Sequence, residues 1–167
     1  MKYIKYNWLL LAVLSLSLSS CFDLEEEVFD RVDSSIYYQN EKIVQGAVAS
    51  IYDTGARSYM EYFWYLQEFS ADQVAWRSWN GGMWGNDEAE KFVLSTHTWT
   101  PDSKIIRSTW ETSWTTIGLC NTLIADLQTL NPASLKMTEE KMKSYIGEVR
   151  TLRAWANYNI IEIWGGA

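Results

Sequence analysis

The chain has 167 residues and a formal net charge of -7, with 14 Lys and Arg against 21 Asp and Glu. This length allows one domain at most. Nucleic-acid binding is not expected, because it depends on clustered cations that release counterions from phosphates. Aromatic residues make up 15% of the chain, with 10 Trp and 10 Tyr, which indicates either an aromatic core or a flat recognition surface.

Residues 1–20 have the layout of a secretory signal. Lys2 and Lys5 precede an uncharged run over residues 6–22, and residues 8–14 of that run are apolar. A spanning helix needs about 20 predominantly apolar residues, and this run has fewer and contains several serines. The segment therefore predicts export rather than a membrane span.

The signal ends in Leu18-Ser19-Ser20-Cys21, which resembles the lipobox of bacterial lipoproteins. In that class the Cys carries a thioether-linked diacylglycerol and an N-acyl chain, and the peptide before it is removed. We therefore expect covalent lipid on Cys21, with no other cofactor. Several acyl chains on one residue bind a membrane far more firmly than one. An ordinary secretory signal followed by a chance Cys is the alternative.

Residues 21–34 form an acidic tether that begins Phe22-Asp23-Leu24-Glu25-Glu26-Glu27. The tether is either a solvated linker or a sorting signal. The second interpretation follows from its likeness to the acidic residues that some Gram-negative groups place after the lipid-bearing Cys of surface-displayed lipoproteins. With Lys2 and Lys5 removed, the formal net charge of the mature chain becomes -9.

Apolar spacing of three and four residues predicts a helix that is capped by Asn40 and ends at Asp53-Thr54-Gly55. Residues 56–104 hold many aromatic residues without sustained periodicity, together with turn signals such as Asn80-Gly81-Gly82. This pattern predicts long aromatic-rich loops with short extended or helical pieces, and loops of this length are usually functional.

Two long helices, joined as an antiparallel hairpin, are predicted after these loops. Pro132 ends the first, and Thr138 caps the second, which ends at Gly165-Gly166. The expected buried stripe of the first helix includes Cys120 as a small hydrophobe: Ile106, Trp110, Trp114, Ile117, Cys120, Ile124 and Leu127. The expected buried face of the second is Met142, Tyr145, Val149, Leu152, Ala156, Ile160 and Ile163.

The second long helix contains Glu148-Val149-Arg150-Thr151-Leu152-Arg153-Ala154-Trp155 and ends in Trp164-Gly165-Gly166. This resembles the SusD/RagB signature, a Glu-x-Arg-x-Leu-Arg-Ala-aromatic helix that ends in aromatic-Gly-Gly. The preceding helix, with Trp110, Ile117, Cys120-Asn121 and Ile124, is similar to the family's Trp-x(6)-Ile-x(2)-small-Asn helix. Family members are several times longer, so the resemblance implies that residues 35–167 are the amino-terminal part of a SusD-like domain.

The resemblance implies an all-α fold of tetratricopeptide-like helical hairpins with long loops that carry the ligand site. It also implies a surface-exposed lipoprotein of the outer membrane, anchored through its lipid. Such a protein captures oligosaccharides for a SusC-like, TonB-dependent outer-membrane transporter and does not cleave them. No enzymatic activity is therefore expected.

The aromatic loops hold the glycan-binding candidates, because sugars stack their C–H faces on aromatic rings while Arg and Asn bond the hydroxyls. The candidates are Trp76, Arg77, Trp79, Asn80 and Trp84. These tryptophans could instead fill a core beneath the loops.

Catalytic and metal chemistry have little support in the sequence. His97 is the only histidine and no Cys pair accompanies it, so no zinc site is expected. A glycosidase needs two carboxylates across a cleft, and nothing pairs the acidic candidates Asp72, Asp87, Glu88 and Glu90.

Glu148, Arg150 and Arg153 look catalytic at first sight. Glu148 lies two and five residues from the two arginines, not at the spacing of three or four that brings opposite charges together on a helix, and we expect these residues to anchor helix packing or loop carbonyls. Two other interpretations of the chain remain: a fragment of a secreted carbohydrate-active enzyme, or a structural surface lipoprotein that binds only protein partners.

Overall fold

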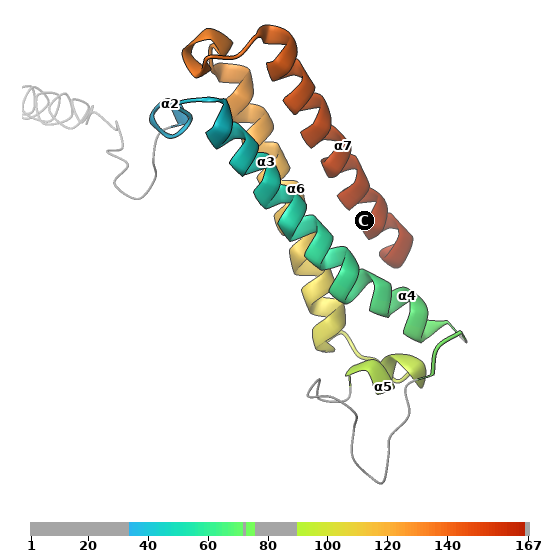
Figure 1. Ribbon diagram of the computed structural model, residues 1–167. Coiled ribbons are helices and arrows are strands. Elements are labelled where there is room, and N and C mark those ends of the chain that lie inside the picture. The colour runs from blue at the N-terminus through green and yellow to red at the C-terminus, as the bar shows by residue number, and fades with distance from the viewer. Residues whose placement is uncertain (1–33, 72, 76–89, 166–167) are drawn as a thin grey trace, which may run out of the picture. The chain divides into compact units, whose positions relative to one another are not determined.

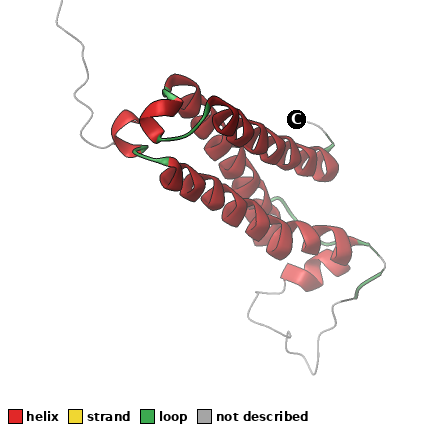
Figure 2. Cartoon of the chain, turned by 45° about the horizontal axis from the view of Figure 1, so that its top comes forward, coloured by secondary structure: helices red, strands yellow, loops and turns green. Residues whose placement is uncertain are grey.

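The computed structural model describes residues 34–71, 73–75 and 90–165, which consist of helices and connecting loops (Figures 1 and 2). All of them belong to one compact unit, Asp33–Ala167. The predicted all-α class is confirmed, since the described residues contain no strand. The tetratricopeptide-like arrangement stays a prediction.

The helices follow one another along the chain in a simple order. They are α2 (Ser34–Tyr37), α3 (Glu41–Arg57), the π-helical turn η1 (Ser58–Phe63), α4 (Trp64–Ser70), α5 (Glu90–Ser95), α6 (Lys104–Thr129), the 3-10 turn η2 (Pro132–Leu135) and α7 (Glu139–Trp164). Among the described helices, none combines the length and the apolarity that crossing a bilayer requires.

α3, η1 and α4 run without a break from Glu41 to Ser70 (Figure 1). Asn40 caps this run as predicted, because its Oδ1 accepts from the Ile43 N–H at 3.2 Å. The predicted end at Asp53-Thr54-Gly55 is wrong. Gly55 is buried within α3, and a Cβ at this position would lie 3.1 Å from Cζ3 of Trp155. This glycine therefore permits close helix packing instead of ending the helix.

The loop predicted over residues 56–104 is also wrong in its first part. The π-helical turn η1 adds a residue to the helix and shifts the face that points inward. Phe63, Leu66 and Phe69 are buried after this shift, whereas Tyr59 and Trp64 remain 38% and 41% exposed. The helical period of this segment could not be recognised in the sequence, because aromatic residues occupy both the buried and the exposed face. The short helix α5 follows, then a loop over residues 96–103, whereas residues 72 and 76–89 of the predicted region lie outside the described residues.

α6 and α7 form the predicted antiparallel hairpin (Figures 1 and 2). α6 ends before Pro132, and the Asn131 side chain caps η2 by accepting from the Ala133 N–H at 3.0 Å. Thr138 Oγ1 accepts from the Lys141 N–H at 3.2 Å and so caps α7. Gly165 ends α7 with a φ of 75°. All these predicted boundaries are confirmed.

The largest hydrophobic cluster lies where α3, α6 and α7 pack together. Cys120 belongs to it with 0% exposure, as predicted, and burial raises the pKa of its thiol. The predicted buried face of α7 is confirmed, although Leu152 and Ile163 are only half-buried. Its fully buried members are Met142, Tyr145, Val149, Ala156 and Ile160.

The predicted stripe of α6 is wrong at Trp110 and Trp114, whereas Ile106 is half-buried against a hydrophobic cluster. Trp110 and Trp114 are 36% and 42% exposed, and the inward face there carries Thr109, Ser113 and Thr116. These side chains are small enough to let η1 and α3 approach α6 closely. Thr109 and Thr116 satisfy their hydroxyls within the helix, by donating to backbone oxygens at 2.7 and 2.8 Å.

Candidate functional site

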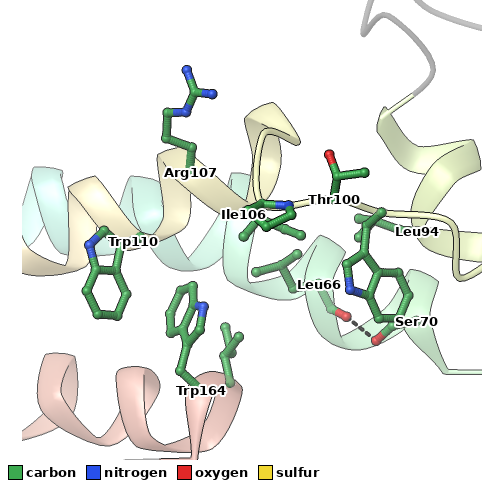
Figure 3. Close-up of a pocket in the computed structure, with 11 residues that line it drawn as sticks. Leu66, Ser70, Leu94, Thr100, Ile106, Arg107, Trp110 and Trp164 are labelled. Atoms are coloured by element: carbon green, nitrogen blue, oxygen red, sulfur yellow. Dashed lines mark hydrogen bonds between the residues drawn. The ribbon is translucent and has the colours of Figure 1, made fainter. Parts of the chain in front are cut away.

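A cavity of about 810 Å³ opens where α4, α5, the start of α6 and the end of α7 come together (Figure 3). Its volume lies in the range of small-molecule sites, roughly 300–1,000 Å³. Three tryptophans form part of the wall, and the other lining residues are mainly apolar. The lining includes Trp99, Trp110, Trp164, Leu66, Leu94, Ile106, Thr100 and Arg107.

A second hydrophobic cluster lies beneath this cavity and shares Leu66 and Leu94 with its lining. Leu66, Phe69, Leu94 and Ile105 are buried together and join α4 and α5 to the start of α6. The Ser70 hydroxyl donates to the Leu66 carbonyl oxygen at the end of α4 (Figure 3). The floor is therefore built from packed helices rather than from loops.

The tryptophans of α6 and α7 meet edge to face beside the cavity. The ring centroids of Trp110 and Trp164 are 5.1 Å apart at an interplanar angle of 76°. Trp110 makes a similar contact with Trp114, at 5.5 Å and 66°. Trp110 and Trp164, two of the aromatic residues that carry the family resemblance, are thus in direct contact.

Trp99 reaches the cavity from the loop over residues 96–103, which hydrogen bonds hold at both ends. At the end of α5, the Thr98 N–H donates to the Val93 oxygen at 3.0 Å and the His97 N–H donates to the Leu94 oxygen at 3.2 Å. His97 has a φ of 56° and its ring contacts that of Trp99.

The other end of this loop is fixed before α6 begins. Ser103 is buried, and its Oγ accepts from the Thr100 N–H at 3.2 Å. Thr100 is also tied through its own hydroxyl, which accepts from the Asp102 N–H at 3.3 Å.

The cavity has a neutral interior over its described lining. Among the described lining residues Arg107 alone is charged, and Figure 3 shows the guanidinium pointing away from Trp110 and Trp164. Arg107 Nη2 lies 3.5 Å from Asp102 Oδ1, outside the hollow. Glu90 is one of the acidic residues that the sequence offered as a glycosidase candidate. Its Oε2 accepts a hydrogen bond from the Ile105 N–H at 3.4 Å, in the first turn of α6.

The glycan-binding candidates Trp76, Arg77, Trp79, Asn80 and Trp84 lie outside the described residues, as do the lipid-attachment residue Cys21 and the acids Asp72, Asp87 and Glu88. Sequence reasoning did not select Trp99, Trp110 or Trp164 as site residues. Trp110 has the spacing of a core residue, and exposure of a large ring cannot be read from spacing alone.

The expectation that the signature charges anchor helix packing is confirmed for Glu148 and Arg153. Glu148 Oε1 accepts from the Tyr52 hydroxyl at 2.9 Å, and this hydrogen bond raises the pKa of Tyr52. Arg153 Nη1 donates to Asn121 Oδ1 at 2.7 Å and so joins α7 to α6. Arg150 is exposed.

Within residues 34–71, 73–75 and 90–165, no group of three or more His, Cys, Asp or Glu side chains is arranged to hold a metal ion. No protein-family model, curated protein or solved structure matches the chain.

Proposed function

We propose that this chain is a surface lipoprotein that captures neutral oligosaccharides and passes them to a SusC-like, TonB-dependent transporter in the outer membrane, as its SusD/RagB resemblance implies. The observation that carries the proposal is the cavity walled by Trp99, Trp110 and Trp164. Partly exposed tryptophans around a neutral hollow suit a ligand that is apolar on its faces and uncharged.

Sugar rings meet this description, because their C–H faces pack against indole rings while their hydroxyls stay hydrated at the edges. An acidic ligand is less suited, since the mature chain has a formal net charge of -9 and Arg107 is already paired with Asp102. The hydroxyl of Thr100 is one polar partner that the lining offers a sugar.

Binding is better supported than cleavage at this cavity. Glycoside hydrolysis needs two carboxylates on either side of the scissile bond. The described lining includes no Asp or Glu, and Glu90 is used in the first turn of α6. The proposal is therefore a binding protein rather than an enzyme.

The contacts of α7 support the resemblance to SusD/RagB proteins. Glu148, Arg153 and Trp164 are signature residues, and each bonds or packs against another helix. A signature made of helix-packing residues describes a fold, so the same fold with a different ligand would keep it.

The membrane anchor in this proposal is the diacylglycerol and N-acyl lipid on Cys21, after removal of residues 1–20. The acidic tether over residues 21–34 then separates the lipid from the helical unit. Trp76, Arg77, Trp79, Asn80 and Trp84 remain proposed glycan contacts in addition to the cavity.

The test is a panel of neutral and acidic polysaccharides and their oligomers, with binding measured by calorimetry and cleavage by the release of reducing ends. We expect a neutral glycan to bind without new reducing ends. New reducing ends would favour the carbohydrate-active enzyme instead. Failure to bind any glycan, with retained binding to a TonB-dependent transporter encoded beside this chain, would favour a structural lipoprotein.

A further inference from the structure

The segment that carries Trp99 begins with a backbone arrangement that usually requires glycine. The hydrogen bonds from Thr98 to Val93 and from His97 to Leu94 form a Schellman motif at the end of α5. The motif places His97 at its left-handed position, with a φ of 56°. Glycine is the common residue there, because a Cβ makes this backbone conformation unfavourable.

The contact that the His97 side chain makes gives a reason for a residue other than glycine at this left-handed position. Its ring centroid lies 5.2 Å from that of Trp99, with an interplanar angle of 46°. Trp99 lines the cavity and is 41% exposed, so the protein covers only part of the indole. Glycine would satisfy the turn but would remove the ring that contacts Trp99.

We propose that His97 is a positioning residue, which holds the indole of Trp99 in its orientation toward the cavity before a ligand arrives. The inference rests on the proposed function for its effect on binding, but the contact itself does not. Holding a side chain in its bound orientation reduces the conformational freedom lost when the ligand binds. Backbone strain at His97 is then retained for a functional reason, as at other ligand sites.

Three substitutions of His97 separate the effect of its aromatic ring from the effect of its backbone conformation. His97→Gly and His97→Asn suit the left-handed backbone but remove the aromatic contact. His97→Phe keeps an aromatic ring and the same backbone strain. If His97 acts only on the fold, binding will follow stability in all three variants. If it positions Trp99, binding will follow the ring.

The first measurement needs no ligand. Because the chain has 10 Trp, fluorescence cannot isolate one of them, so the full chain is labelled with 5-fluorotryptophan and studied by ¹⁹F NMR. Loss of a resonance in Trp99→Phe identifies Trp99. We expect that resonance to move toward free 5-fluorotryptophan in His97→Gly and His97→Asn, and to stay displaced in His97→Phe. An unchanged Trp99 resonance in His97→Gly would overturn the proposal.

The second measurement uses maltohexaose and cellohexaose, neutral glucose hexamers of different linkage, as calorimetric probes. For whichever hexamer binds, we expect roughly two- to tenfold weaker affinity in His97→Gly and His97→Asn, and affinity within about twofold of wild type in His97→Phe. The melting temperature of His97→Gly should nevertheless rise by roughly 2–5 °C as strain is relieved. Unchanged affinity in both ring-deleting variants would reject the positioning role.

These two measurements keep the inference separate from the proposed function. If neither hexamer nor any member of the glycan panel binds the wild-type chain, sugar capture fails. The ¹⁹F resonance of Trp99 still decides whether His97 holds the indole in place.

Discussion

The indole of Trp155 lies directly against the backbone of Gly55, so that a Cβ on Gly55 would be 3.1 Å from Cζ3 of the ring. Trp155 is the aromatic residue of the α7 signature, and its ring also contacts Tyr59 at 5.6 Å. The signature thus meets α3 at a position where a side chain larger than that of glycine would crowd the indole. This contact explains why the sequence has a glycine in the middle of a helix.

Gly55→Ala should lower the free energy of unfolding by up to about 1 kcal/mol, because overpacking outweighs the better helix propensity of Ala. Gly46→Ala in the same helix is the matched control, since no atom lies within 4 Å of the added Cβ. We expect that control to stabilise the protein by about 0.5–1 kcal/mol. If urea titrations show that both variants stabilise the protein equally, the Trp155 ring moves aside for the added Cβ without loss of free energy.

The hydrogen bond between Arg153 and Asn121 should couple α7 to α6. A double-mutant cycle with Arg153→Met and Asn121→Ala is expected to give a coupling free energy of about 1 kcal/mol. Arg150→Met removes an exposed Arg from the same helix and should change stability by less than about 0.5 kcal/mol. A coupling energy near zero would mean that this signature Arg does not hold the helices together.

Tyr38 should make stability depend on pH in the alkaline range. Burial, together with the charge and hydrogen bond of Asp126, raises the pKa of Tyr38 from 10.0 to about 12. Because the folded-state pKa is raised, the stabilisation is complete below pH 10 and is lost as the pH rises to about 12. In Tyr38→Phe, the fall in unfolding free energy over this window should be about 2 kcal/mol smaller than in wild type.

Urea titrations at pH 9 and pH 11.5 measure this difference. Tyr158→Phe is the matched control for the loss of one tyrosine hydroxyl, because Tyr158 is 57% exposed and is not among the groups that raise the pKa of Tyr38. If Tyr38→Phe loses as much stability as wild type over the same window, Tyr38 is not the group responsible.

Cys21→Ser should abolish lipid attachment and leave an unprocessed precursor, because the lipobox supplies no other thiol. Metabolic labelling with palmitate in the producing cell measures this directly. Cys120→Ser is the control and should keep the label, since Cys120 is buried in the helical core. Label retained by Cys21→Ser would contradict the lipoprotein assignment.

The long helices were predictable because their boundaries depend on local chemistry. Asn40, Thr138 and Pro132 act within one or two turns of their own position, and the structure places a helix start or end beside each. The continuation through Gly55 was not predictable in the same way. It depends on Trp155, a residue 100 positions away whose contact no local pattern reports.

The candidate site was less predictable than the fold. Trp110 and Trp164 have helical spacing, and their spacing alone is the same whether they fill a core or line a cavity. The exposure of Trp110 follows from the small residues Thr109 and Ser113, which take the inward positions of α6. The proposed contacts from Trp76 to Trp84 remain a sequence prediction.

The most direct test of sugar capture is the affinity of Trp99→Ala for the glycan that wild type binds. Stacking an indole face on a sugar removes on the order of 100 Å² of apolar surface from water, worth roughly 2 kcal/mol or about thirtyfold in Kd. Trp64→Ala is the control, because Trp64 is also 41% exposed but does not line the cavity.

For the wild type and these two variants, calorimetry measures the affinity for the glycan and thermal melting measures stability. We expect about thirtyfold weaker binding for Trp99→Ala, wild-type affinity for Trp64→Ala, and similar melting temperatures for the two variants. A Trp99→Ala variant that binds glycan as tightly as wild type would contradict sugar capture at this cavity.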